Sequence, residues 1–255
     1  MSQNRTIWTT PSEFLRSRQP DQPVLFFSPA ALQNNAALFL REFPGLVTFA
    51  VKSNPCEAVL ANLVAAGISA FDVASPAEID LVRRCAPHAA LHYNNPVRSC
   101  AEIRFAHHAG VRSFSVDSFS ELEKLYQLVP AQGVEVAVRF KLPVKGAAYD
   151  FGDKFGADPQ TAATLLARSH ALGFVASLTF HPGTQCNDPM AWDAYIRMAG
   201  EIATRAGVRI FRLNVGGGFA SHRLGDEMPD LARIFAVIGR VTGAVFGETS
   251  PALLC

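Results

Sequence analysis

The sequence has 255 residues, of which 49% are hydrophobic and 18% charged, and its formal net charge is +1 at pH 7. This length allows one large core, while a near-neutral charge with scattered Lys and Arg gives no reason to expect a nucleic-acid or membrane partner. The cysteines are odd in number and widely spaced, which excludes a disulfide framework or a zinc site and predicts reduced thiols in a cytoplasmic protein; they are Cys56, Cys85, Cys100, Cys186 and Cys255.

The first predicted elements precede the main pattern of the chain. Val24–Phe27 is a short apolar run that predicts a strand, and a helical stretch follows from Pro29 to about Glu42. We expect residues 1–43 to lead into the main domain, residues 44–255, and the strand to pair with something outside that domain.

Residues 44–255 alternate between short β-rich runs and helical patterns. One helix is framed by Asp188 before a proline and by Gly207 at its end. Runs such as VEVAVRF and VASLTF are continuously apolar, which is typical of a sheet buried on both faces. The pattern predicts a parallel (β/α)8 TIM-like barrel, with a doubly wound open sheet as the alternative. The predicted strands are Leu46–Val51, Ser69–Val73, Ala89–Asn94, Arg112–Val116, Val134–Phe140, Phe174–Phe180, Arg209–Val215 and Pro251–Cys255.

The eighth predicted strand, PALLC, is the end of the sequence. No eighth helix follows, so we expect the outer faces of its neighbours to lie bare. Exposed apolar patches and open strand edges are liabilities in a natural domain. We therefore expect the chain to be truncated.

Polar residues follow the strands where (β/α)8 enzymes carry their chemistry, at the carboxyl ends. Lys52 stands between an apolar strand and Ser-Asn-Pro, which predicts a buried ammonium that needs a partner. A glycine triplet after strand seven has the backbone freedom to wrap a phosphate. A phosphorylated carbonyl compound would suit both, and pyridoxal phosphate (PLP) is the simplest candidate. The residues at these strand ends are Lys52, Asp72, Asn94, Asn95, Asp117, Arg139, His181 and Gly216–Gly218.

Each of these residues also has a purely structural interpretation. Lys52 could be a solvated surface charge. Asp72 could cap the following helix, although Ser75 competes for that position. His181 could be a turn histidine, and Arg139 could pair with a nearby carboxylate.

Four motifs occur in order: Phe49–Pro55 (FAVKSNP), Phe71–Ser75 (FDVAS) with Glu78, Phe180–Cys186 (FHPGTQC) and Asn214–Phe219 (NVGGGF). They resemble the motifs of group IV (fold type III) PLP-dependent decarboxylases, which include ornithine, diaminopimelate and biosynthetic arginine decarboxylases. The resemblance runs from about Pro23 to the last residue. The segments HYNNPVRSCAEI, SVDSFSEL and KFGA (154–157) are most similar to ornithine decarboxylases.

The resemblance implies a barrel of the alanine racemase/decarboxylase type that binds PLP. Lys52 would carry PLP as a Schiff base and return a proton to the substrate, and His181 would stack on the pyridine ring. Thr184 and the glycine run would hold the phosphate, and Glu78 would have a supporting role at most. The implied catalytic residues are Lys52, His181 and Asp72, and the implied cofactor-binding residues are Lys52, Asp72, Arg139, His181, Thr184, Gly216, Gly217 and Gly218. No metal is expected.

The sequence departs from this family at its end. The family continues with Glu-Pro-Gly-Arg, whose glutamate keeps the pyridine nitrogen protonated, and with a C-terminal β-domain; this sequence stops at Cys255. The resemblance implies that Val24–Phe27 belongs to that β-domain. It also implies that the full-length protein is a homodimer and that this fragment alone is inactive.

The implied function is decarboxylation of a basic amino acid, foremost L-ornithine to putrescine in polyamine biosynthesis. A lysine or diaminopimelate decarboxylase is an alternative. A non-catalytic PLP-binding barrel, either a cofactor carrier or a decarboxylase-like regulator, is another. A racemase of the same barrel type fits less well, because the residues after Lys52 do not match the racemase pattern.

Overall fold

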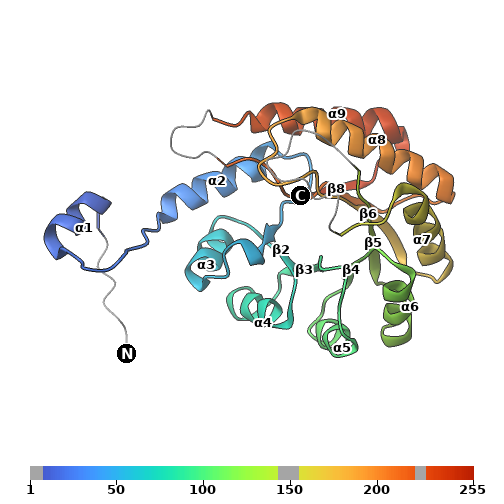
Figure 1. The fold of residues 1–255 in the computed structure, drawn as a ribbon, viewed down its shortest axis with the longest axis horizontal. Coiled ribbons are helices and arrows are strands. Elements are labelled where there is room, and N and C mark those ends of the chain that lie inside the picture. Colours follow the sequence, from blue (N-terminus) through green and yellow to red (C-terminus); the bar gives the residue numbers. More distant parts are fainter. Residues whose placement is uncertain (1–7, 143–154, 222–227) are drawn as a thin grey trace.

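The computed structural model describes residues 8–142, 155–221 and 228–255 (Figure 1). Within these ranges eight parallel strands form one sheet in sequence order, β1 to β8, with helices on its outer side. The elements are α1 (Pro11–Arg18), α2 (Pro29–Glu42), β1 (Phe49–Ala50), η1 (Val51–Ser53), α3 (Glu57–Ala65), β2 (Ala70–Val73), α4 (Pro76–Cys85), β3 (Ala90–Tyr93), α5 (Cys100–His108), β4 (Ser113–Val116), α6 (Phe119–Leu128), β5 (Glu135–Arg139), α7 (Pro159–Ala171), β6 (Val175–Thr179), α8 (Pro189–Ala206), β7 (Arg212–Asn214), α9 (Leu231–Phe246), η2 (Gly247–Thr249) and β8 (Ala252–Leu254).

Hydrogen bonds between the two ends of the sheet close it into a barrel. The Leu46 N–H donates to the Leu253 carbonyl at 2.9 Å, and the Cys255 N–H donates back to the Leu46 carbonyl at 3.1 Å. The Thr48 N–H donates to the Cys255 carbonyl at 2.7 Å. A doubly wound open sheet would leave these edge groups unpaired, so the predicted (β/α)8 barrel is confirmed and the open-sheet alternative is excluded.

Side-chain caps fix where the helices begin. The Ser75 hydroxyl accepts from the Glu78 N–H at 3.3 Å and so begins α4, which means that Asp72 is not its cap. The Asp188 carboxylate accepts from the Met190 N–H at 2.9 Å and begins α8. Gly207 ends α8 in the left-handed conformation (φ 64°), so the predicted frame of this helix is confirmed.

The helix that precedes the barrel, α2, packs between α3 and α9. The Gln33 side chain of α2 donates to the Asn62 side chain of α3 at 2.8 Å. On the other side, the Phe39 and Phe43 rings contact the Phe235 ring of α9, with centroids 5.2 and 5.5 Å apart. Helix α2 thus occupies the position on the outside of the barrel where an eighth helix is missing after β8. The expectation that the strands next to β8 have bare outer faces is therefore wrong at this position.

The segment Val24–Phe27 is in none of the strands, so the strand predicted there is absent from this structure. Its four apolar side chains are exposed, Leu25 by 94%. The Phe26 ring contacts Phe14 of α1 with a centroid distance of 5.6 Å, and α1 stands apart from the barrel (Figure 1). Extended backbone becomes a strand only beside another strand.

The barrel interior is more polar than the strand sequences predict. Glu135 begins β5 within the run VEVAVRF, and only 7% of it is exposed. His92 of β3 is 5% exposed, and Arg212 of β7 lies 3.5 Å from the Glu135 carboxylate. The description of this strand as continuously apolar is therefore wrong at Glu135. Inside the barrel, the Glu135 carboxylate forms an ion pair with Arg212.

No helix in the described part of the chain combines the length and apolarity needed to cross a membrane.

Candidate active site

Parallel strands bring their carboxyl ends to one end of a barrel, called here the mouth. The strand register aligns the predicted residues: Asp72 pairs with Ala50, two residues before Lys52, and Arg139 pairs with Thr179, two residues before His181. The structure thus brings the predicted set together at the mouth, with Lys52 in η1, Asp72 in β2, Asn94 and Asn95 after β3, Asp117 after β4, Arg139 at the end of β5, His181 and Thr184 after β6, and Gly216–Gly218 after β7.

Lys52 lies in the single 3₁₀ turn that follows β1. The turn is closed by the Asn54 N–H, which donates to the Val51 carbonyl at 3.1 Å. Val51 is fully buried, whereas Lys52 is exposed. The prediction of a buried ammonium is therefore wrong, because the turn directs the apolar residue into the core. The positive charge of Lys52 still lies close enough to Asp72 and His181 to lower the pKa of each.

Asp72 presents a buried carboxylate oxygen to the mouth. Its Oδ1 has no hydrogen-bond partner among the described residues. Burial raises the pKa of Asp72 to about 6, and the Asn94 and Thr48 side chains and the charge of Lys52 oppose that rise. A buried acceptor without a partner costs about 1–3 kcal/mol, which indicates that a donor or a cation belongs beside it.

The sequence reasoning missed one neighbour of Asp72. Thr48 interrupts the apolar run LVTFAV, and its hydroxyl donates to the Cys255 carbonyl at 2.7 Å. Thr48 lies two residues before Ala50. Because side chains alternate between the two faces of a strand, Thr48 lies on the same face as Ala50. The sequence could have revealed Thr48, because a polar residue interrupts an apolar strand at a position whose side chain faces the barrel interior.

His181 is held as a neutral imidazole. Its Nδ1 accepts a hydrogen bond from the Gly183 N–H at 3.1 Å, so that nitrogen carries no proton. Burial and then the charges of Arg139 and Lys52 lower the pKa of His181 to about 4. This hydrogen bond within the turn agrees with the structural interpretation of His181 as a turn histidine. The same bond also fixes the orientation of the imidazole ring at the mouth. A neutral flat ring can stack on an aromatic ligand at physiological pH.

Arg139 lies between a carboxylate and an aromatic ring. Burial lowers the pKa of Arg139, and nearby Asp117 opposes that shift. The Arg139 guanidinium carbon is 5.9 Å from the centroid of the Phe155 ring, and the Asp117 carboxylate accepts from the Gly156 N–H at 3.0 Å. Asp117 thereby connects Arg139 to the KFGA motif, of which Lys154 lies outside the described residues.

The glycine run after β7 is bonded to the loop after β6. The Cys186 N–H donates to the Gly218 carbonyl at 2.8 Å, and the Gly216 N–H donates to the Asn214 side chain at 2.8 Å. Phe219 then anchors the run, because its ring stacks on Trp192 of α8 with a centroid distance of 5.1 Å. The two predicted phosphate-binding segments therefore form one connected surface.

The three glycines are required for different reasons, which gives a testable contrast. Gly216 and Gly218 have φ of 71° and 87°, and a Cβ at either would overlap a backbone carbonyl oxygen of the loop after β6. A Cβ at Gly217 would meet only the His181 Nε2, at 3.7 Å. We expect Gly218→Ala to destabilise the protein by about 1–3 kcal/mol in urea unfolding. Gly217→Ala should leave stability unchanged and weaken PLP binding, because its methyl group enters the mouth. Equal stability losses in the two variants would contradict this assignment.

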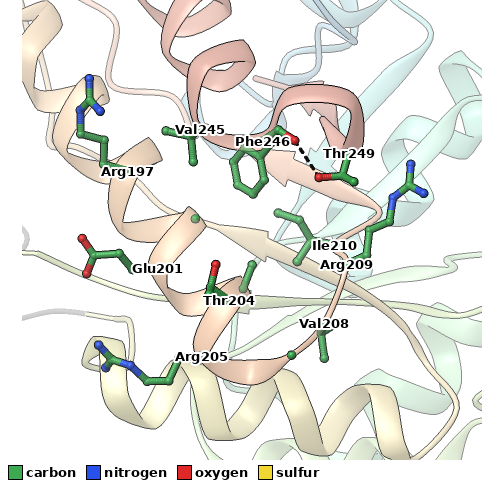
Figure 2. A pocket seen from close by; sticks show the side chains of 13 residues that line it. Arg197, Glu201, Thr204, Arg205, Val208, Arg209, Ile210, Val245, Phe246 and Thr249 are labelled. Atoms are coloured by element: carbon green, nitrogen blue, oxygen red, sulfur yellow. Dashed lines mark hydrogen bonds between the residues drawn. The ribbon is translucent and has the colours of Figure 1, made fainter.

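A cavity of about 790 Å³ lies elsewhere on the described part of the chain (Figure 2). It is an outer groove between α8 and the end of α9, with Arg197, Glu201, Arg205 and Arg209 around apolar side chains. Its thirteen lining residues include no lysine or histidine. The residues that can perform chemistry lie at the mouth, so the groove is not the candidate active site.

The donors at the mouth suit PLP. Lys52 offers an accessible amine for its aldehyde, His181 a neutral ring for its pyridine, and the glycine run a backbone surface for its phosphate. The unpartnered oxygen of Asp72 offers a site for positive charge. Among the described residues no cluster of His, Cys, Asp and Glu could hold a metal ion.

Comparisons with known proteins agree with this geometry. The family model described as "pyridoxal-dependent decarboxylase, pyridoxal binding domain" matches residues 30–254. Decarboxylase flvG of Aspergillus flavus is 32% identical over 191 residues, which are 72% of this chain and 44% of that protein. The lysine/ornithine decarboxylase of Selenomonas ruminantium is 30% identical over 234 residues, 89% of this chain and 59% of that one. Ornithine decarboxylase of Mus pahari is 32% identical over 187 residues, 71% and 40% of the two chains.

Solved structures have the same fold. Lysine decarboxylase from Selenomonas ruminantium superposes with a TM-score of 0.82 at 27% identity, covering 97% of this chain and 66% of that one. The complex of SrLDC with PLP and cadaverine gives 0.81 at 26% identity, with 97% and 64% covered. The chain spans 44% and 59% of the first two curated relatives. The family model matches most of this chain, and the candidate cofactor-binding residues lie together at one end of the barrel, so this chain belongs to the pyridoxal-dependent decarboxylases and contains their PLP-binding domain.

Proposed function

We propose that the protein is a PLP-dependent decarboxylase of basic amino acids and that L-ornithine is its preferred substrate. The observation that carries this proposal is Lys52, an accessible amine beside the buried Asp72 carboxylate, at the mouth of a barrel of this family. Lys52 is then the residue that binds the cofactor covalently.

The other residues at the mouth hold and orient the cofactor in this proposal. His181 stacks on the pyridine ring, and the Gly183 N–H fixes the orientation of the imidazole. Thr184 and the glycine run bind the phosphate through hydroxyl and backbone groups. Asp72, with Arg139 nearby, sets the charge around Lys52 and the ring.

The overall reaction replaces the α-carboxylate of the amino acid with hydrogen: the bond to the carboxyl carbon breaks, carbon dioxide leaves, and one proton is added at the α-carbon. When bound, PLP supplies the electron sink for the charge left at that carbon. Lys52 Nζ holds the proton that the α-carbon receives, and the Asp72 carboxylate stabilises the ammonium form of Lys52 before that transfer. Fixed groups at a developing charge supply the largest share of such acceleration.

Support for ornithine comes from relatives and from local segments. Two relatives named above are a lysine/ornithine and an ornithine decarboxylase, and each covers more than two thirds of this chain. The segments HYNNPVRSCAEI and SVDSFSEL are most similar to ornithine decarboxylases. Lysine is the nearest competitor, since it differs from ornithine by one methylene, which is typically worth about 1–3 kcal/mol of discrimination. A homodimer and a place in polyamine biosynthesis remain predictions of the resemblance.

The test is carbon dioxide release by the full-length protein with PLP from L-ornithine, L-lysine, L-arginine and diaminopimelate, compared by kcat/KM. We expect L-ornithine to give the highest value, with L-lysine about tenfold or more lower. A higher value for another substrate would overturn the ornithine assignment. Covalent PLP binding without turnover above a Lys52→Ala control would instead support the non-catalytic alternative.

A further inference from the structure

A second cavity opens at the end of the barrel opposite to the mouth. Its volume is about 600 Å³, and it lies where β3 to β7 begin. Pockets of about 300–1,000 Å³ are typical of small-molecule sites. Ionisable side chains line this cavity on several sides, namely Arg83, His88, His92, Arg112, Glu135 and Arg212.

Arg212 lies at the centre of this end of the barrel. Its Nη1 is 3.5 Å from Glu135 Oε2 and 3.4 Å from each ring nitrogen of His92. Among the described residues, its Nε and Nη2 make no hydrogen bond or ion pair. The side chain also lines a cavity of about 470 Å³ beside β8 and a small interior one shared with Asn94 and Asn214. The guanidinium carbon also lies 5.3 Å from the centroid of the Phe211 ring, another lining residue of the cavity. The Nε–Nη2 edge therefore has an aromatic neighbour but no hydrogen-bond acceptor among the described residues.

The charges around the cavity do not balance. Arg83 and Arg112 donate to backbone carbonyls, to Ala89 at 2.7 Å and to His107 at 2.8 Å, and these neutral partners leave both charges uncompensated. Burial and the charge of Arg212 lower the pKa of His92 to about 4, so that ring is neutral at physiological pH. The lining carries three arginines, Arg83, Arg112 and Arg212, but only one glutamate, Glu135, so positive charge is in excess.

We propose that this cavity binds a small oxyanion, a carboxylate or a phosphate, on the Nε–Nη2 edge of Arg212. That edge presents two parallel N–H donors, the geometry that carboxylate and phosphate oxygens match. Glu135 opposes the anion and holds the guanidinium in place from the other side. A buried ion pair that only stabilised the fold would have a short N–O distance and no adjacent cavity. The Arg212–Glu135 distance is 3.5 Å, and the pair lines the cavity.

The test is isothermal titration calorimetry with inorganic phosphate and with malonate, each at constant ionic strength. The protein is saturated with PLP, so the phosphate-binding surface at the mouth is occupied. We expect saturable binding of at least one probe, and Arg212→Gln should weaken it by about tenfold or more. Glu135→Gln should strengthen it, because the opposing carboxylate is gone. The phosphate and malonate arms show which oxyanion the site prefers.

Two variants separate loss of binding from loss of fold. Arg212→Gln leaves the buried Glu135 carboxylate unpaired, so the double variant Arg212→Gln/Glu135→Gln removes both charges and should fold, bind PLP and bind no anion. Arg209→Gln changes an arginine of the outer groove and should bind anions like the unchanged protein. Three results would each overturn the proposal: no binding of either probe to the unchanged protein, undiminished binding by the double variant, or no strengthening by Glu135→Gln.

Discussion

Lys52→Ala is expected to abolish covalent PLP binding and to lower decarboxylation by the full-length protein by roughly a thousandfold or more, because a methyl group cannot form the bond to the cofactor or return the proton. The exposed position of Lys52 predicts that its removal has little effect on folding, within about 0.5 kcal/mol of the unfolding free energy. The direct measurement is borohydride reduction of the PLP-loaded protein followed by mass spectrometry, which should place the cofactor mass on the peptide that contains Lys52.

Two matched variants sharpen this experiment. Lys52→Arg keeps the positive charge beside Asp72 but has no nucleophilic amine, so it should behave like Lys52→Ala in the labelling experiment. Lys124→Ala removes a lysine of α6 whose ammonium pairs with Glu121 at 2.6 Å, and it should leave labelling and turnover unchanged. Cofactor mass on a lysine other than Lys52 would refute the assignment even if activity were lost.

The position of Lys52 was predictable from the sequence, but its exposure was not. Strand alternation and the rule that chemistry lies at carboxyl strand ends place Lys52, Asp72 and His181 at one end of a barrel. Whether a side chain after a strand turns inward depends on the backbone of that turn. Here a single 3₁₀ turn buries Val51 and exposes Lys52, and no periodicity over three residues encodes that choice.

Long-range packing accounts for the other differences. Glu135 stands in a run that looks apolar, and only its pairing with Arg212, a residue of β7, makes its burial possible. The gap beside β8 is covered by α2, a helix more than 200 residues earlier in the sequence, through Phe39 and Phe235. Val24–Phe27 has strand composition without a neighbouring strand. Each outcome depends on contacts between distant segments, which local patterns do not determine.

Asp72→Asn is expected to make the PLP-free protein more stable at neutral pH and to weaken PLP binding at the same time. Burial raises the pKa of Asp72 from 3.8 to about 6, so above pH 6 the folded protein carries a carboxylate that its surroundings disfavour. The stabilising effect of such a group is present below pH 3.8 and is lost as the pH rises through 6. The asparagine side chain stays neutral, so the variant should gain at most about 3 kcal/mol at pH 7.5 and almost nothing at pH 4.

Urea unfolding of both proteins between pH 4 and 7.5 measures this difference. His92 and His181 act in the opposite direction, because burial lowers the pKa of each from 6.5 to about 4, and their contribution is present above pH 6.5 and lost as the pH falls toward 4. Both histidines are present in both proteins, so their effect cancels in the comparison. A variant less stable than the unchanged protein at pH 7.5 would show that the Asp72 carboxylate is well paired without cofactor.

The cofactor measurement gives the second half of the Asp72 prediction. The carboxylate that lacks a partner at Oδ1 is the group that would meet positive charge when PLP and Lys52 are joined. Its loss should weaken PLP binding by about ten- to a hundredfold at pH 7.5. In the unchanged protein, affinity should also fall below about pH 6, where Asp72 takes up a proton, and Asp72→Asn should remove that part of the pH dependence. A stabilised variant that binds PLP with unchanged affinity would mean that Asp72 is an unfavourable buried acid with no part in holding the cofactor. If Asp72→Asn is more stable and also binds PLP more weakly, the buried Asp72 carboxylate destabilises the PLP-free protein but contributes to cofactor binding.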